Sequence, residues 1–394
     1  MTVMKTEYIP RLLQPPEQSF FLCGPRGTGK TTWVNHEFSS SYSVNLLDES
    51  LYQSYLRDIS LFAGELRNLG DGTWVFVDEI QRMPSLLNEV HRFIEEKQLR
   101  FILTGSSARK LKRGGVNLLA GRALGKQLLP FVPEELNNSE EHKTYSLDNA
   151  LDFGTLPLVL ESPNKEETLK AYVNMYLKEE IKAEGIVRNL PGFSRFLPIA
   201  GLFHGRITNT AGIARDAGVP RTTVNDYLTI LEDTLLVFRL PAYEGKLRVR
   251  ERKHPKLYWV DPGLVRGVNN RFGKLSPEEE GALFEGFVAT ILRAYKEYRN
   301  CFHEMYYWAS ASGPFSEFDF LIDHDRGLAG IEVKSTNNFS RSMLKGLLAI
   351  KALPRLTKRA VVYRGSRRMK TEEGILVLPF EDFCGMVETG ELFD

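Results

Sequence analysis

The sequence predicts an α/β protein that begins with a doubly wound parallel sheet and ends in a second α/β domain. Three observations favour this fold class. Buried-type strands alternate with helical segments through residue 131, a pattern of two short helices occupies 207–233, and strands carrying charged residues recur between 305 and 378. A chain of 394 residues exceeds what one hydrophobic core usually organises. We therefore expect domains at 1–133, 134–200, 201–270 and 271–394.

The composition excludes a disordered or fibrous protein. Hydrophobic residues make up 42% and charged residues 26%, which is typical of a globular chain in water. Lys and Arg total 51 against 50 for Asp and Glu, so any contact with DNA must come from a local patch. Residues 1–10 lack the apolar core of a signal peptide, and no apolar run is long enough to span a bilayer. We expect a cytoplasmic protein with no membrane partner, in which Cys23, Cys301 and Cys384 are reduced packing residues.

The first chemical signal follows the apolar run 20–23, which predicts a strand. It leads into a complete Walker A pattern made of Gly24, Pro25, Arg26, Gly27, Thr28, Gly29, Lys30, Thr31 and Thr32. Glycines let backbone N–H groups turn inward around a phosphate, Lys30 supplies positive charge, and the Thr31 hydroxyl reaches Mg²⁺. The expected helix 32–38 points its positive end at the anion. A glycine-rich turn could be only a turn, but strand, loop and helix in this order favour binding of ATP and Mg²⁺.

A second apolar strand, 73–80, ends in two carboxylates, Asp78 and Glu79. This is a Walker B pattern, in which Asp78 holds Mg²⁺ through water and Glu79 orients and deprotonates the attacking water. An acidic cap on the next helix is the alternative, and the neighbouring phosphate loop makes it the weaker one. The pair therefore predicts an ATPase rather than a protein that only senses nucleotide.

The buried-type strand 99–107 ends in small polar residues, as the sensor strand of such ATPases does. Thr104 or Ser106 would contact the γ-phosphate or the attacking water, although a helix cap before Ala108 explains them as well. Downstream, Arg122 offers a cation that would serve as a sensor or as an arginine finger. Two other arginines compete for that role, Arg109 and Arg113.

Residues 134–200 carry Leu, Lys and Glu at helical spacing and predict a helical linker or lid. Residues 209–228 then predict a helix-turn-helix, in which Gly218 permits the tight turn and Pro220 starts the second helix. The side chains expected to face a DNA major groove are Arg221, Thr222, Thr223 and Asn225.

Two strands, 235–242 and 256–260, look like the wing of a winged helix, and the loop between them is basic. Its cations are Lys246, Arg248, Arg250, Arg252, Lys253 and Lys256, against only Glu244 and Glu251. Such a patch is typical of a surface that contacts phosphates. The alternative is that this winged helix docks a protein or serves as a lid.

The C-terminal part predicts a nuclease-like site. A helix over 277–298 carries Glu285, and strands follow at 305–308, 317–322 and 330–335. If the last two pair as a hairpin, Asp319 lies beside Glu332 and Lys334, the carboxylates hold Mg²⁺, and Lys334 lowers the pKa of the attacking water or stabilises the transition state. Glu285 would approach the same metal. A helix at 342–352 and strands at 360–363 and 375–378 complete the order of a restriction-endonuclease-like core, whereas a charged strand edge is the alternative.

Together these motifs resemble a family of predicted prokaryotic AAA+ superfamily ATPases, which join an N-terminal ATPase to a C-terminal domain of uncharacterised function. The resemblance covers nearly the whole chain. It implies a winged helix, a restriction-endonuclease-like (PD-(D/E)XK) or Holliday-resolvase-like fold, and kinship with archaeal origin-binding and signalling ATPases. The sequence departs from the usual nuclease pattern at Phe318, where many such enzymes have Pro before the aspartate.

Three functions follow from these motifs. The leading one is an ATP-hydrolysing protein that binds DNA, in which the nucleotide state repositions the winged helix and the nuclease-like domain. The second is a signalling switch that docks a protein partner through an inactive nuclease-like domain. The third is an ATP-gated nuclease of a defence or mobile-element system. A trans-acting arginine would require a homo-oligomer, while a monomer is equally compatible with these residues.

Overall fold

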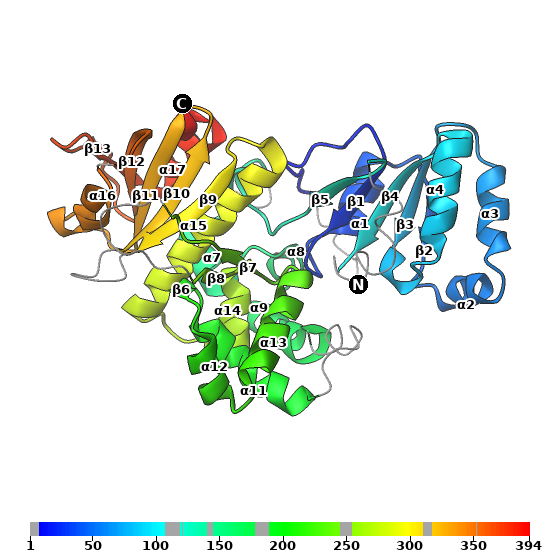
Figure 1. Ribbon diagram of the computed structural model, residues 1–394, viewed down its shortest axis with the longest axis horizontal. Helices are drawn as coiled ribbons and strands as arrows, with labels where there is room; N and C mark the ends of the chain where they lie inside the picture. Colours follow the sequence, from blue (N-terminus) through cyan, green and yellow to red (C-terminus); the bar gives the residue numbers. More distant parts are fainter. Residues whose placement is uncertain are drawn as a thin grey trace. The chain divides into compact units, whose positions relative to one another are not determined.

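The computed structural model describes residues 8–106, 119, 121–139, 145–177, 189–244, 254–309, 317–351 and 353–394. The chain divides into two compact units (Figure 1). The N-terminal unit comprises Pro10–Pro130 and Ile230–Leu236, and the C-terminal unit comprises Met1–Ile9, Phe131–Thr229 and Val237–Asp394. Whether the C-terminal unit contains three separate domains, at 134–200, 201–270 and 271–394, stays a prediction.

The N-terminal unit is built on the parallel sheet that the sequence predicts. Five strands lie in the order β2-β3-β4-β1-β5, and every neighbouring pair is parallel (Figure 1). Their bounds are β1 Phe20–Cys23, β2 Tyr42–Asn45, β3 Trp74–Asp78, β4 Arg100–Gly105 and β5 Leu124–Gln127. The three central strands are the three apolar runs identified in the sequence, whereas edge strands β2 and β5 carry too few apolar residues to be predicted.

Both faces of this sheet are covered by helices, because successive strand residues point to opposite sides. Phe20 contacts the rings of Trp33 on α1 and Phe38 just after it, at centroid distances of 6.1 and 5.8 Å. Phe21 and Leu103 pack on the other face, in one cluster with residues of three further helices. The four helices are α1 Lys30–Glu37, α2 Glu49–Arg57, α3 Ser60–Arg67 and α4 Leu86–Lys97. A doubly wound α/β fold is therefore confirmed for this unit.

The first part of the C-terminal unit is mainly helical. It contains α6 Pro133–Asn137, α7 Leu147–Phe153, α8 Pro157–Leu160, α9 Lys165–Ala171, the π-helix Tyr172–Leu177, α11 Leu190–Leu202 and α14 Pro262–Asn269. In the linker or lid predicted over 134–200, α9 continues as a π-helix, and residues 140–144 and 178–188 lie outside the described part of the chain.

Two helices and a small sheet follow in the predicted order. The helices are α12 Thr210–Ala217 and α13 Arg221–Asp233, and the antiparallel sheet β6-β8-β7 contains β6 Arg206–Ile207, β7 Val237–Leu240 and β8 Lys256–Trp259. The Asn209 side chain caps α12, and Gly218 ends it with a φ of +62°, a left-handed conformation that glycine adopts without a steric penalty.

The last part of the C-terminal unit is a mixed six-stranded sheet in the order β13-β14-β12-β11-β10-β9 (Figure 1). Strands β9, β10 and β11 are antiparallel, and β11, β12 and β14 are parallel. The strands are β9 Glu304–Ala309, β10 Glu317–His324, β11 Gly327–Lys334, β12 Leu356–Tyr363, β13 Met369–Lys370 and β14 Leu376–Pro379. The helices are α15 Pro277–Arg299, α16 Lys345–Ala349 and α17 Phe380–Glu388.

The predicted hairpin is present, since β10 and β11 pair antiparallel from Phe320↔Ile331 to His324↔Gly327. The predicted helix 342–352 is shorter, because its first turn is the 3₁₀-helix Arg341–Leu344 and its α-helical part ends at Ala349. Within the described ranges, no helix combines the length and the apolar character needed to cross a bilayer.

Candidate functional site

The phosphate loop lies where β1 ends and α1 begins, at the carboxyl edge of the parallel sheet. Gly27 and Gly29 both have a φ of +81°, so a residue with a side chain would be strained at either position. A Cβ atom on Gly24 would lie 2.4 Å from the Leu128 carbonyl oxygen. The glycines of the Walker A pattern are therefore required by the backbone path of the loop.

Lys30 is the first residue of α1 and is almost fully buried. Its ammonium donates to the carbonyl oxygens of Gly24 at 2.8 Å and Pro25 at 3.2 Å, which holds the charge inside the loop. The Thr28 hydroxyl donates to the Pro25 carbonyl at 2.9 Å. Arg26, Thr31 and Thr32 are exposed at the mouth of the loop.

Asp78 ends β3 and is held from two sides by hydroxyl groups. The Thr31 hydroxyl donates to Asp78 Oδ2 at 2.9 Å, and the Thr104 hydroxyl donates to Asp78 Oδ1. Thr104 reaches Asp78 because β4 is the neighbouring strand, with Val77 opposite Leu103. The structure therefore gives buried Thr104 a positioning role for Asp78, and its predicted contact with the nucleotide stays a prediction.

Glu79 has a φ of 58°, which is uncommon for a residue with a side chain. Its backbone N–H donates to the Thr104 hydroxyl at 3.3 Å, and its carboxylate accepts a hydrogen bond from the Gln81 amide. The same amide donates to the Ser106 hydroxyl at 3.3 Å. Gln81 was not predicted from the sequence, because a single glutamine two residues after Glu79 has no pattern of its own.

Arg11 is a second residue that sequence reasoning misses. It is 8% exposed, and its guanidinium donates to the carbonyl oxygens of Thr28, at 3.2 Å, and Leu129. It thus joins the phosphate loop to the chain just beyond β5. An isolated arginine among the first residues carries no signal for such a role, since its partners lie 17 and 118 positions away.

Arg122 lies at the amino-terminal ends of the strands, whereas the phosphate loop lies at their carboxyl ends. It precedes Leu124, which pairs with Phe20 at the start of β1, and its Nε pairs with the Glu95 carboxylate near the end of α4. A sensor role toward the loop of its own chain has no support from this position, and a finger role toward another subunit stays a prediction. Arg109 and Arg113 lie outside the described residues.

The residues predicted to contact DNA fall into two groups. Arg221, Thr222 and Asn225 are exposed at the start of α13, Thr223 is half-buried, and Arg221 Nε donates to the Thr210 hydroxyl at 3.0 Å. The basic loop lies outside the described residues, which include none of Lys246, Arg248, Arg250, Arg252 and Lys253.

The prediction was wrong for Lys256, the last cation assigned to that loop. It was expected on a surface that contacts phosphates, but it is 1% exposed. Its ammonium lies 2.9 Å from Glu285 Oε1, 2.6 Å from Glu317 Oε1 and 3.4 Å from Asp319 Oδ1. Pairing with these carboxylates is what makes burial of the charge tolerable.

The carboxylates Glu285, Glu317, Asp319 and Glu332 form what we call the carboxylate cluster. Three elements supply them: α15, β10 and β11. The structure brings together the predicted residues Glu285, Asp319 and Glu332, and Lys334 pairs with Glu332. In the described part of the chain, however, no three His, Cys, Asp or Glu residues are arranged to hold a metal ion. Their predicted role as metal ligands stays a prediction.

Burial and mutual repulsion change the proton affinity of this cluster. Burial, with the nearby Asp319 charge, raises the pKa of Glu285 to about 7 and that of Glu332 to about 8. Burial alone would lower the pKa of Lys256, but the charge of Glu285 and the other acidic groups raises it well above its usual value. Lys256 is therefore charged at neutral pH while the cluster retains a proton.

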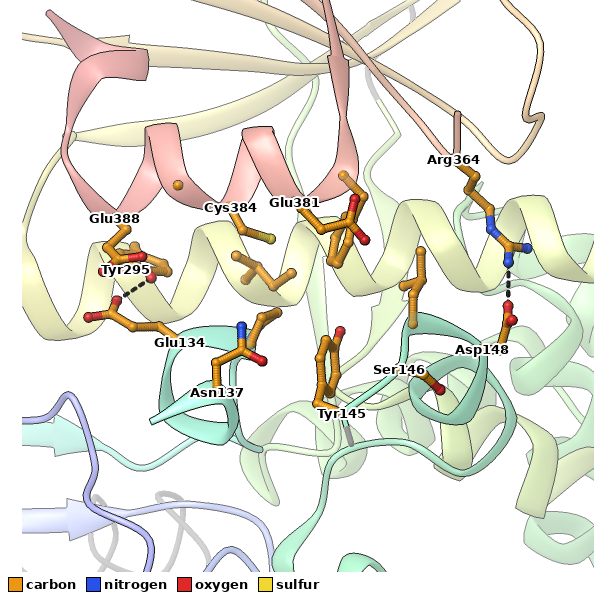
Figure 2. Close-up of a pocket in the computed structure, with 15 residues that line it drawn as sticks. Glu134, Asn137, Tyr145, Ser146, Asp148, Tyr295, Arg364, Glu381, Cys384 and Glu388 are labelled. Carbon is orange, nitrogen blue, oxygen red and sulfur yellow. Dashed lines mark hydrogen bonds and ion pairs between the residues drawn. The ribbon is translucent and has the colours of Figure 1, made fainter. Parts of the chain in front are cut away.

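A separate cavity of about 510 Å³ lies between α6, α15 and α17 (Figure 2). Two pairs of its polar groups contact each other, since Tyr295 donates to Glu134 and Arg364 pairs with Asp148, as the dashed lines show, whereas, among the described residues, the Tyr145 hydroxyl is buried without a hydrogen-bond partner. Arg299 beyond the cavity also pairs with Glu134, at 2.6 Å. The residues predicted for catalysis, metal binding or DNA binding are not among its lining residues.

With this geometry in place, three family models match the chain. Residues 16–137 match the model of an AAA domain, residues 144–274 match a domain of unknown function (DUF8612), and residues 280–383 match another (DUF4143). The N-terminal unit contains an AAA domain. This match agrees with the phosphate loop, the order of the five strands and the position of Asp78, and it implies nucleotide binding.

Relatives extend over most of the chain. The uncharacterized protein Rv2008c of Mycobacterium tuberculosis is 26% identical over 382 residues, which are 94% of this chain and 82% of the relative. The uncharacterized protein MJ1544 of Methanocaldococcus jannaschii is 24% identical over 316 residues, 73% of this chain and 70% of the relative. The crystal structure of protein VC1899 from Vibrio cholerae aligns with 95% of this chain and 97% of its own at 10% identity, but its TM-score of 0.25 establishes no shared fold.

Proposed function

We propose that the AAA domain is a Mg²⁺-dependent ATPase and that ATP hydrolysis controls DNA binding by the C-terminal unit. One observation carries the ATPase part of the proposal. The hydroxyls of Thr31 and Thr104 hold both carboxylate oxygens of Asp78 at the sheet edge where the phosphate loop lies. Glu79 follows Asp78 directly and would serve as the base.

The residues present fit ATP and Mg²⁺. The loop Gly24–Gly29 offers backbone N–H groups, and Lys30 would exchange its carbonyl partners for phosphate oxygens. Thr31 and Asp78 would hold Mg²⁺, which neutralises charge on the phosphates when bound. Glu79 would accept a proton from water, and the amide of Gln81 orients its carboxylate.

The ATPase test compares the wild type with Glu79→Gln. Because a positioned base contributes about 10²- to 10⁴-fold to rate, Glu79→Gln is expected to lower kcat by at least about 100-fold and to leave ATP affinity close to wild type. Steady-state phosphate release and equilibrium binding of a labelled ATP analogue measure the two quantities. Glu96→Gln is the matched control, since Glu96 is an exposed carboxylate near the far end of α4. Hydrolysis that persists in Glu79→Gln would remove the assigned base.

Exposed residues at the start of α13 support the DNA part of the proposal. Arg221, Thr222 and Asn225 share one exposed region, and the turn at Gly218 sets α13 against α12. An arginine contact to DNA is worth about 1–3 kcal/mol, so Arg221→Ala should weaken duplex binding by roughly 5- to 150-fold. Fluorescence anisotropy at two salt concentrations measures this effect, because phosphate contacts weaken as salt rises.

Arg215→Ala is the matched control for Arg221→Ala, since it removes the same charge from the surface of α12, where Arg215 pairs with Asp216. If duplex binding is absent, or if Arg221→Ala and Arg215→Ala behave alike, the second candidate takes precedence. That candidate is a switch that docks a protein partner through an inactive nuclease-like domain. It is favoured by Lys256, whose ammonium lies among the carboxylates that would otherwise be available to a metal.

A further inference from the structure

The strongest unassigned feature of the molecule is the ammonium of Lys256, the first residue of β8. It contacts carboxylates on two elements distant in sequence, Glu285 on α15 and the pair Glu317 and Asp319 on β10. It also lies 5.6 Å from the centre of the Tyr307 ring, within the range of a cation–π interaction. A buried cation with these partners occupies the position that a divalent metal takes between carboxylates.

Protein donors already engage at least one oxygen of each predicted metal ligand, Glu285, Asp319 and Glu332. Glu285 Oε1 accepts from Lys256 and, at 2.5 Å, from the Tyr258 hydroxyl. Asp319 Oδ2 accepts from the Val333 backbone N–H at 2.8 Å, and Glu332 Oε1 pairs with Lys334. Within the described part of the chain, the oxygen of the cluster recorded as buried without a hydrogen-bond partner is Glu332 Oε2. Mg²⁺ takes six ligands in near-ideal octahedral geometry, so it would have to displace the donors from Glu285 Oε1, Asp319 Oδ2 and Glu332 Oε1 before these oxygens could bind it.

Electrostatics make simultaneous occupancy unfavourable. A metal bonded to Glu285 and Asp319 would lie within a few ångströms of the Lys256 ammonium, and like charges at that distance repel strongly in a poorly hydrated site. The Lys256 side chain is enclosed by protein, so its ammonium cannot move aside into solvent to make room for a metal. The two cations therefore compete for one position.

We infer that the Lys256 ammonium replaces the divalent metal of the carboxylate cluster, so that the nuclease-like part of the chain is a metal-free binding module that does not cleave phosphodiesters. Without a metal the cluster has no Lewis acid to activate water. Its role is instead structural, because one buried cation ties strand β8 of the three-stranded sheet to α15 and β10. This inference is independent of the proposed ATPase activity.

The test measures Mn²⁺ binding to the full-length, nucleotide-free protein by the EPR signal of free Mn²⁺. The wild type and Asp319→Asn are titrated side by side, so that any Mn²⁺ bound near Asp78 contributes equally to both. The expected result is the same number of bound Mn²⁺ ions in the two proteins. An ion that the wild type binds and Asp319→Asn does not bind would overturn the inference.

The second measurement removes the competing cation. Lys256→Met should gain one bound Mn²⁺ ion, the double variant Lys256→Met with Asp319→Asn should lose it again, and Mn²⁺ should raise the Tm of the single variant alone. Lys334→Met is the matched control, because it removes a charge from the same cluster at a partly exposed position and should gain no ion. If folded Lys256→Met gains no ion, the lysine does not stand in for a metal. If that variant does not fold, the wild-type titration decides alone.

Cleavage provides a third, independent readout. The wild type is incubated with Mn²⁺ and with branched, single-stranded and duplex DNA, with and without ATP. No cleavage is expected. Cleavage that disappears in Glu332→Ala would overturn the inference while leaving the proposed ATPase untouched, since Glu332 lies on β11 of the C-terminal unit and not in the AAA domain.

Discussion

Lys30 and Lys256 both carry buried ammonium groups, yet these groups contact different kinds of atoms. Lys30 donates to two neutral carbonyl oxygens of its own loop, and the nearby Asp78 is held by two hydroxyl groups. Lys256 contacts three carboxylates directly. Carbonyl and hydroxyl groups thus position Lys30 and Asp78 at the carboxyl ends of the parallel strands. In the carboxylate cluster, the charges are already paired within the protein.

This difference teaches how a site that binds ligands differs from one that stabilises the fold. In the phosphate loop, neutral groups orient the charged side chains without cancelling them, which is the preorganisation that ligand binding requires. In the C-terminal unit, ionisable groups are buried against each other or held neutral. The stability of the C-terminal unit should therefore depend on pH and on individual charges much more than that of the phosphate loop.

The largest expected effect concerns His204, a fully buried residue of the C-terminal unit. Its Nδ1 accepts from the Trp259 backbone N–H at 3.0 Å, and burial lowers the pKa of the imidazole to about 3. The unfolded chain takes up a proton near pH 6.5, but the folded chain does not. The contribution of His204 to the free energy of unfolding is therefore fully present above pH 6.5. It is lost as the pH falls toward 3, by up to about 5 kcal/mol.

Urea unfolding between pH 7 and pH 4 measures this loss. His204→Asn keeps an acceptor near the Trp259 N–H and removes the titrating group, so it should unfold with a smaller dependence on pH. His303→Asn is the control, since the His303 side chain is 61% exposed. An acid slope that is the same in His204→Asn and the wild type would show that other groups control acid unfolding of this unit.

The next effect sharpens the comparison of the two lysines directly. Removing one partner of a buried ion pair costs about 3–5 kcal/mol, because the other charges remain buried without compensation. Lys256→Met should therefore lower the free energy of unfolding by that amount, whereas Lys30→Met, which removes a donor to two carbonyl oxygens, should cost less, about 1–3 kcal/mol. Differential scanning calorimetry of the two variants checks the order. A larger loss in Lys30→Met would contradict the division between the two sites.

The contrast between the lysines also explains what the sequence could predict. The strand, the glycine turn, Lys30 and Thr31 are contiguous, and a strand that ends in Asp78 and Glu79 must lie at the same edge of a parallel sheet. Local pattern and fold class were therefore enough to predict the phosphate loop and the two carboxylates. The strands β10 and β11 and the helix α15 were also predictable from local sequence. Each carries a continuous apolar pattern.

What could not be predicted depends on contacts between distant segments. Lys256 follows a run of basic residues and was grouped with them, but its partners Glu285 and Asp319 lie 29 and 63 positions further along the chain. Arg122 follows the sensor strand in sequence, yet the parallel pairing of β5 with β1 places it at the opposite edge. Charge and spacing do not reveal either arrangement, because burial and strand order decide both.

The smallest expected effect concerns Arg11, which joins the phosphate loop to the chain after β5. Its guanidinium donates to the Thr28 carbonyl oxygen from one nitrogen and to the Leu129 carbonyl oxygen from another, a planar fork that the single nitrogen of lysine does not reproduce. Losing a partner at a buried carbonyl costs about 1–3 kcal/mol, and part of that cost should appear as weaker binding of ATP. Arg11→Lys should raise KM for ATP by roughly 5- to 10-fold with kcat close to wild type, since Glu79 and Asp78 are untouched, and Arg67→Lys on the surface of α3 is the control. A fall in kcat at unchanged KM would instead mean that Arg11 acts on the attacking water, which would make the support of the loop part of catalysis rather than of binding.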